Sequence, residues 1–202
     1  VMRLADSVEG ILPSHDPSQY KATTLAIYLD SQRPLPLDDI LDIADRMSLG
    51  LKRLHACGLI HCDVKPANVL MGADWVARLA DFGLATAESL DRMTQSGVML
   101  GTPLYMAPEL AKTAGNNLCP QSDVYSLGVM LFELLTGRLP FDLNQKALPD
   151  AARIVCEDDP PPLGRLRADL RGDLELLAGM ALDKESARRY LNAGDLAADL
   201  RR

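Results

Sequence analysis

The chain has 202 residues, of which 48% are hydrophobic and 24% charged, a composition typical of one globular domain and not of a disordered or fibrous protein. It carries 28 acidic and 21 basic side chains, a net charge of −7, and this balance argues against broad binding to nucleic acid. The longest apolar stretch, residues 124–135, is shorter than the roughly 20 residues that a membrane span needs, so we expect no membrane segment. Four cysteines without a C-x-x-C pair predict neither a zinc site nor a disulfide framework, and a cytoplasmic location is expected.

The first third of the chain is expected to hold a helix end, two strands and one long helix. Residues 1–9 space their apolar side chains like one face of a helix, and residues 11–16 and 23–29 are predicted to be short strands. Apolar residues then recur every three or four positions over 37–54, after a proline and with two aspartates at the start. This spacing predicts an amphipathic helix.

The remainder is expected to contain two more short strands, one long loop and several helices. Residues 68–71 and 75–79 are β-like, and residues 86–100 form a polar stretch without a period, which predicts a loop. The segment 123–136 is apolar nearly all round, so we expect a buried helix at the centre of the domain. Further helices are predicted near 150–155, 169–181 and 193–202.

The residues that carry chemistry form an ordered set of motifs. H-x-D-x-K-P-x-N spans residues 61–68, and D-F-G at 81–83, G-T-P at 101–103 and A-P-E at 107–109 follow it. This set resembles the protein kinase family and is far more specific than any one of its parts. The resemblance implies an α+β, protein kinase-like fold. Residues 36–202 would form a mostly helical C-lobe, and residues 1–35 a remnant of the small β lobe with the end of the regulatory helix, two strands and the hinge.

Phosphoryl transfer needs a carboxylate that orients the attacking hydroxyl, and cations that neutralise phosphate charge. By resemblance, Asp63 aligns the hydroxyl, Lys65 steadies the γ-phosphate, and Thr102 bridges these two residues. Asn68 and Asp81 would hold magnesium, so ATP and Mg²⁺ are the implied cofactors. The alternative is that these are turn and capping residues. Lys65 and the G-T-P segment resemble the serine/threonine branch, which implies a protein substrate with a Ser or Thr acceptor.

A second group of residues is expected to hold the nucleotide base. By resemblance, Ile27 would lie near the gatekeeper position, Tyr28 and Leu29 would form the hinge, and Leu70 would pack beneath adenine.

Several other matches are expected to be structural. By resemblance, Asp123 pins the backbone of the catalytic loop, with an ordinary helix N-cap as its alternative. Glu109 would pair with Arg189 across the lobe. His61 is interpreted as a packing residue beneath the D-F-G phenylalanine and not as a base, whereas His55 belongs to no motif and is interpreted as an ordinary surface or core histidine.

Two departures from the family pattern bear on activity. Cys62 stands where regulated kinases have the arginine that receives the phosphate of a phosphorylated activation loop. We therefore expect activity to depend little on phosphorylation at Thr94 or Ser96, and we interpret the Cys62 thiol as inert. In addition, no G-x-G-x-x-G loop and no V-A-x-K lysine precede the catalytic loop.

Two functions follow as hypotheses. The first is an ATP-dependent serine/threonine protein kinase, here as a fragment that lacks the glycine-rich loop and the ATP-positioning lysine and that is poorly active by itself. The second is a catalytically inactive, kinase-like binding or scaffold module. The complete set of Asp63, Lys65, Asn68 and Asp81 favours the first hypothesis.

Overall fold

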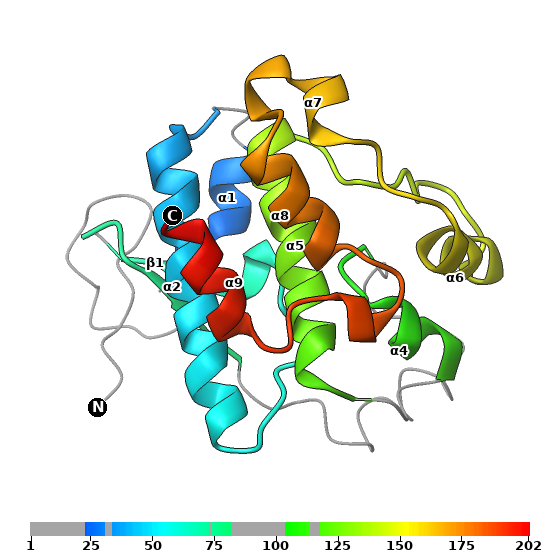
Figure 1. Ribbon diagram of the computed structural model, residues 1–202, viewed down its shortest axis with the longest axis horizontal. Helices are drawn as coiled ribbons and strands as arrows, with labels where there is room; N and C mark the ends of the chain where they lie inside the picture. Colours follow the sequence, from blue (N-terminus) through cyan, green and yellow to red (C-terminus); the bar gives the residue numbers. More distant parts are fainter. Residues whose placement is uncertain (1–22, 31–33, 73, 82–103, 114–117) are drawn as a thin grey trace, which may run out of the picture.

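The helix α5 (Pro120–Thr136) lies at the centre of the computed structural model, which describes residues 23–30, 34–72, 74–81, 104–113 and 118–202 (Figure 1). Every residue of α5 from Ser122 to Leu135 is buried except Glu133, as its apolar composition predicts. The helix ends at Gly137, which adopts a left-handed φ of 72° and donates its N–H to the Glu133 carbonyl at 2.7 Å. The predicted buried helix is confirmed.

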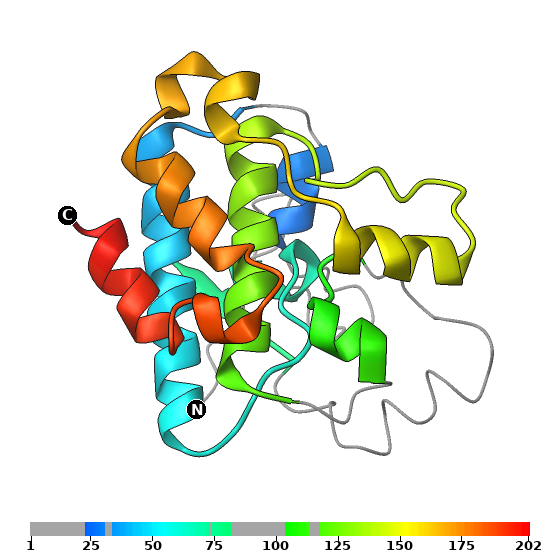
Figure 2. The same cartoon turned by 45° about the vertical axis from the view of Figure 1, so that its right-hand side comes forward.

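The long helix α2 (Leu37–Ala56) runs beside α5 and the C-terminal helix α9 (Ala193–Leu200), as Figures 1 and 2 both show. The negative charges of two aspartates in its first turn stabilise the helix by interacting with the positive end of its dipole. Its core face consists of apolar side chains three or four positions apart: Ile40, Ile43, Ala44, Met47 and Leu51. The helix predicted over 37–54 is therefore confirmed and is two residues longer.

Helix α8 (Asp173–Ala181) packs on α5 from another side (Figure 2). The contact needs a glycine, because a Cβ atom on Gly128 would lie only 2.8 Å from the Cβ of Ala181. The predicted helix over 169–181 is shorter in the structure, since Gly172 has a left-handed φ of 112° and separates α8 from a 3-10 helix, η3 (Ala168–Leu170). A short helix α7 (Leu163–Leu166) precedes η3.

Helix α6 (Leu148–Glu157) stands to one side of this group, against α4 (Pro108–Thr113) (Figure 2). Its apolar face belongs to a small second core of Phe141, Leu143, Ala151 and Val155. The helix predicted near 150–155 is confirmed with longer bounds. The last 3-10 helix, η4 (Ser186–Arg188), precedes α9.

One small sheet follows the 3-10 helix η2 (Pro66–Asn68). Strands β1 (Val69–Met71) and β2 (Ala77–Leu79) pair antiparallel with Val69 opposite Leu79. The strand predicted over 75–79 begins two residues later than expected, because Trp75 has a left-handed φ of 56° and belongs to the turn.

The strand predicted over 23–29 is wrong. Only Thr24 forms a β-bridge, with Leu70, and the next residues form the helix α1 (Leu25–Asp30). The spacing of Leu25, Tyr28 and Leu29 is that of a helix face, with Leu25 fully buried. Tyr28 and Leu29, which are expected to form the hinge, lie in this helix, and their role as the hinge stays a prediction.

Other expectations concern residues that the structure does not describe. The helix end over 1–9, the strand over 11–16 and the loop over 86–100 lie outside the described residues. The division into 1–35 and 36–202 stays a prediction. Within the described ranges, no helix has both the length and the apolar character that crossing a membrane requires.

Candidate active site

The loop between α2 and η2, together with η2 itself, brings together three of the predicted site residues: Asp63, Lys65 and Asn68. Asp63 Oδ2 lies 2.8 Å from the ammonium of Lys65 and accepts a hydrogen bond of 2.8 Å from the side-chain amide of Asn68. The same amide donates to the Asp63 carbonyl at 2.8 Å. Pro66 starts the single 3-10 turn of η2, which folds Asn68 back onto Asp63. The carboxylate is thus held by two donors while its side chain stays 53% exposed.

The sheet brings the backbone before Asp81 next to Asn68. The N–H of Ala80, the residue before Asp81, donates to the Asn68 carbonyl at 2.9 Å, so the end of β2 lies beside the start of β1. Asp81 has a left-handed φ of 58° and an exposed side chain. Asn68 and Asp81 therefore lie near each other in the fold, although 13 positions separate them in the sequence.

The chemistry of Asn68 and Asp81 fits a hard divalent cation. Because the Asn68 amide nitrogen donates to Asp63, its amide oxygen is left as a ligand, and Asp81 adds a carboxylate. Magnesium prefers oxygen ligands and is usually bound by one or two protein carboxylates together with substrate phosphates. Among the described residues, no group of three or more His, Cys, Asp or Glu side chains that could hold a metal occurs.

A buried aspartate fixes the backbone of the catalytic loop. Asp123 of α5 accepts hydrogen bonds from the N–H groups of His61 at 2.8 Å and Cys62 at 2.7 Å, as the resemblance predicts. Its alternative as an N-cap is wrong, because Cys119 occupies that position. Asp123 also contacts His55 Nε2 at 2.8 Å. His55 is therefore a core histidine, one of the two expected alternatives, and its contact with this anchor is a role that no sequence motif indicated.

His61 packs inside the lobe and is not available as a base. It is fully buried, its Nδ1 accepts the N–H of Asp63 at 3.3 Å, and its Nε2 lies 2.9 Å from the Ala80 carbonyl. This pattern assigns the proton to Nε2, which donates to the carbonyl. The imidazole therefore links the catalytic loop to the residue before Asp81. The phenylalanine expected to stack on it lies outside the described residues.

Burial raises the pKa of the Cys62 thiol to about 12, and the neighbouring Asp123 carboxylate acts in the same direction. The thiol is therefore protonated near neutral pH, and only the thiolate is strongly nucleophilic. These surroundings agree with the interpretation of Cys62 as inert.

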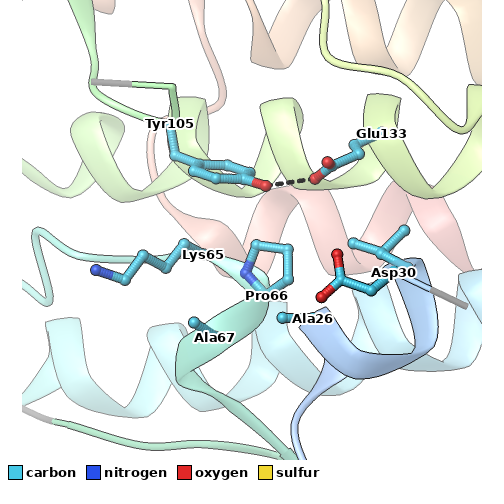
Figure 3. A pocket seen from close by; sticks show the side chains of 8 residues that line it. Ala26, Asp30, Lys65, Pro66, Ala67, Tyr105 and Glu133 are labelled. Carbon is cyan, nitrogen blue, oxygen red and sulfur yellow. Dashed lines mark hydrogen bonds between the residues drawn. The ribbon is translucent and has the colours of Figure 1, made fainter. Parts of the chain in front are cut away.

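A pocket of roughly 150 Å³ adjoins the catalytic loop (Figure 3). Tyr105 and Glu133 lie on one side, where the tyrosine hydroxyl donates to the carboxylate at 2.5 Å, and Lys65 and Asp30 lie on the other. Burial raises the pKa of Glu133, and the charge of Asp30 adds to this effect. Sequence reasoning missed this pocket, although one signal existed: Glu133 is the single acid in the apolar run 124–135.

The residues predicted to hold the base have varied surroundings. Leu29 lines the pocket beside the catalytic loop, whereas the ring of Tyr28 contacts that of Trp75 with centroids 5.0 Å apart. Ile27 is 38% exposed, and Leu70 is half-buried in β1. Thr102 lies outside the described residues.

The expected pair of Glu109 and Arg189 is confirmed. Two parallel hydrogen bonds of 2.8 Å join the guanidinium to the carboxylate, and Ser122 donates to the same carboxylate at 2.7 Å. Arg189 also donates to the carbonyls of Gln121 and Asp183 at 3.0 and 2.7 Å. This network ties α4, α5 and the segment before α9 together.

Comparison with known proteins agrees with the motifs. The family model of the protein kinase domain matches residues 18–162. The chain is 35% identical over 177 residues to a serine/threonine-protein kinase, drp72, of Corynebacterium efficiens, a match covering 88% of the chain and 33% of that protein. It is 34% identical over 197 residues to the kinase PknB of Mycobacterium leprae, covering 97% and 31%, and 38% identical over 163 residues to PknA of Mycobacterium tuberculosis, covering 81% and 36%. The chain thus spans about a third of the length of these relatives.

Proposed function

Because the chain belongs to the protein kinase family, we propose that it supplies the catalytic lobe of a serine/threonine kinase that transfers the γ-phosphoryl group of ATP to a Ser or Thr hydroxyl of a protein. The observation that carries this proposal is the arrangement of Asp63, Lys65 and Asn68 around one exposed carboxylate. The names of the relatives, all serine/threonine kinases, support the choice of acceptor.

Asp63 would orient the acceptor. Lys65 and Asn68 both occupy Oδ2, which leaves Oδ1 to accept a hydrogen bond from the substrate hydroxyl. The hydroxyl proton can move to this oxygen as the new bond to phosphorus forms. Lys65, 36% exposed in its side chain, places an ammonium beside the carboxylate, where it neutralises charge on the transferred group.

Asn68 and Asp81 would hold Mg²⁺, which neutralises phosphate charge when ATP is bound. Asp123 binds the backbone of the loop before Asp63, and the imidazole of His61 binds the residue before Asp81. Together they fix the positions of Asp63 and Asp81 relative to each other. The 202-residue sequence carries no glycine-rich loop and no V-A-x-K lysine. Since positioning supplies much of the catalysis, we expect this chain by itself to transfer phosphate slowly.

The test is transfer of labelled phosphate from ATP to Ser- and Thr-containing peptides by the full-length natural protein. Asp63→Asn should lower kcat by roughly 100-fold to 10,000-fold, the range for loss of a positioned acid or base. Asp38→Asn, on an exposed position of the first turn of α2, is the matched control and should leave kcat unchanged. An Asp63→Asn enzyme with more than about a tenth of the normal kcat would contradict the proposal. Absence of any transfer or Mg²⁺–ATP binding by the natural protein would favour the binding module.

A further inference from the structure

Three polar side chains of the buried helix α5 bind one short segment of the chain. Ser122, Ser126 and Glu133 are four and seven positions apart, about one and two helical turns, so they share one face of the helix. The Ser122 hydroxyl donates to the carboxylate of Glu109 at 2.7 Å, and the Ser126 hydroxyl donates to the carbonyl of Tyr105 at 2.7 Å. Glu133 accepts the Tyr105 hydroxyl. This polar stripe therefore sets the position of the segment along α5.

Tyr105 is held at both ends. Ser126 binds its main-chain carbonyl, and Glu133, two turns or about 10 Å further along α5, binds its hydroxyl. The tyrosine ring therefore lies along the helix and cannot turn away from it without breaking one of these bonds. In Figure 3 the ring forms one wall of the pocket, and Lys65 lies across from it.

The hydroxyl of Ser126 has one proton and two acceptors within reach. Its oxygen lies 2.7 Å from the Tyr105 carbonyl and 3.1 Å from the carbonyl of Ser122. In an α-helix the Ser122 carbonyl already accepts the backbone N–H of Ser126, four positions later. Within the described ranges, no other donor is found for the part-buried Tyr105 carbonyl. The bond to Tyr105 is thus the shorter of the two, and it is the one that has no substitute.

We propose that Ser126 is a positioning residue for the protein substrate, because it fixes the wall of the pocket that faces the catalytic loop. This inference rests on the proposed function. Lys65, across the pocket from Tyr105, places its ammonium 2.8 Å from Asp63 Oδ2. A protein chain that presents a hydroxyl to Asp63 passes beside this wall. Its alignment therefore depends on where Ser126 holds Tyr105, and displacements of about 1 Å can change rates by about 100-fold.

Replacement of Ser126 by alanine should shift the wall without releasing it. Ser126 is only 4% exposed, so water has little access to replace the lost hydroxyl. A part-buried carbonyl without a donor is unfavourable, and we expect the main chain at Tyr105 to move toward another donor or toward water. The bond from Tyr105 to Glu133 and the full burial of Ala107 would still keep the segment on α5.

The first test compares Ser126→Ala with the full-length natural protein in the transfer of labelled phosphate from ATP to Ser- and Thr-containing peptides. Ser48→Ala is the matched control, because Ser48 is also buried and its hydroxyl donates at 2.8 Å to the Ala44 carbonyl inside its own helix α2. We expect kcat/KM for the peptide to fall about tenfold in Ser126→Ala and to stay within about twofold in Ser48→Ala.

The use of ATP should not change. Asn68 and Asp81 lie in η2 and just after β2, outside the segment that moves, so the KM for ATP and the hydrolysis of ATP without peptide should stay within about twofold in both variants. An unchanged kcat/KM for the peptide in Ser126→Ala, or an equal fall in ATP hydrolysis, would overturn the proposal.

Hydrogen exchange of the 202-residue chain measures the hold on the segment directly and needs no activity. Amides of residues 104–113 should exchange about tenfold faster in Ser126→Ala than in the natural chain, and at the natural rate in Ser48→Ala. Equal exchange there in all three chains would refute the hold of Ser126 on the segment. Faster exchange of α2 and α9 in Ser126→Ala would show a general loss of structure and would also overturn the positioning role.

The two measurements separate this inference from the proposed function. If the full-length protein transfers no phosphate, the proposed function fails, and the role of Ser126 in positioning a substrate fails with it. The exchange result still decides whether Ser126 holds Tyr105. If the protein transfers phosphate and Ser126→Ala transfers it equally well, only the inference about Ser126 fails.

Discussion

Replacement of Arg189 by methionine should be among the most damaging single changes in the lobe. The guanidinium is fully buried and donates to Glu109 twice, and also to the carbonyls of Gln121, Asp183 and Lys184. Methionine fills a similar volume but donates nothing. The variant would remove both guanidinium hydrogen bonds from the half-buried carboxylate of Glu109, which would keep those from the neutral donors Ser122 and Cys119.

Removal of one partner from a buried ion pair typically costs about 3–5 kcal/mol, because the other charge is left without compensation. A domain of this kind has a total free energy of unfolding of about 5–15 kcal/mol, so the loss is a large fraction of the whole. Arg188→Met is the matched control, since the Arg188 ion pair with Glu185 is 67% and 65% exposed. Such exposed pairs contribute about 0–1 kcal/mol.

Urea unfolding at pH 7, followed by far-ultraviolet circular dichroism, measures both variants. We expect Arg189→Met to lose at least about 3 kcal/mol and Arg188→Met less than about 1 kcal/mol. A double variant, Arg189→Met with Glu109→Met, should recover part of the loss because no charge is then left buried. If the two single arginine variants unfold at the same urea concentration, the reasoning about this buried pair is refuted.

The pair also has a consequence for acid stability. Burial alone would raise the pKa of Glu109, but the hydrogen bonds from Arg189 and Ser122 outweigh it and hold the pKa below its ordinary value. A lowered folded-state pKa stabilises the fold above the unfolded-state pKa of about 4.3, and this contribution is lost as the pH falls through the folded-state value. Glu109→Gln should therefore lose less stability than the natural chain between about pH 5 and pH 3.

Three further predictions concern other parts of the lobe. Gly128→Ala should destabilise the fold by about 1–3 kcal/mol, because the added Cβ has no space against α8. Gly179→Ala is the control: nothing lies within 4 Å of its added Cβ, so its effect should be neutral or stabilising by less than about 1 kcal/mol. Thermal melts of both variants test this difference. Asp123→Asn should lower the free energy of unfolding by about 2–3 kcal/mol, since an acceptor of two catalytic-loop amides becomes neutral; stability equal to that of the natural chain would contradict it. In the full kinase, Thr94→Ala with Ser96→Ala should keep kcat within about twofold, and a collapse would show that loop phosphorylation is required.

The accuracy of the sequence predictions follows the length of the segments. Helices α2 and α5 were predictable because each shows one consistent pattern over many residues, amphipathic in α2 and apolar in α5. Helix α1 was not, because its six residues follow two threonines that favour strands, and periodicity in so short a run does not distinguish the two. In the folded chain, tertiary packing that buries Leu25 stabilises the helix over the strand.

In the candidate site, contacts between residues close in the sequence were predictable, and contacts between distant residues were not. The contacts among Asp63, Lys65 and Asn68 are local, so a motif of eight residues contains them. The pairing of His55 with Asp123 and the Tyr105–Glu133 contact join residues 68 and 28 positions apart. The first contact arises where α2 packs on α5, and the second where the turn before α4 packs on α5, and one sequence carries no record of that packing.

The catalytic loop is anchored to α5 without help from the side chain at position 62. Asp123 binds Cys62 through its backbone N–H, a group that every residue except proline possesses. The left-handed φ of 64° at this position is uncommon for residues other than glycine and is least tolerated by β-branched and bulky side chains. A substitution here therefore keeps the hydrogen bond to Asp123 and changes the backbone strain of the loop. The attachment of the loop is thus independent of the side-chain chemistry at this position, whereas the backbone conformation restricts which residues fit there.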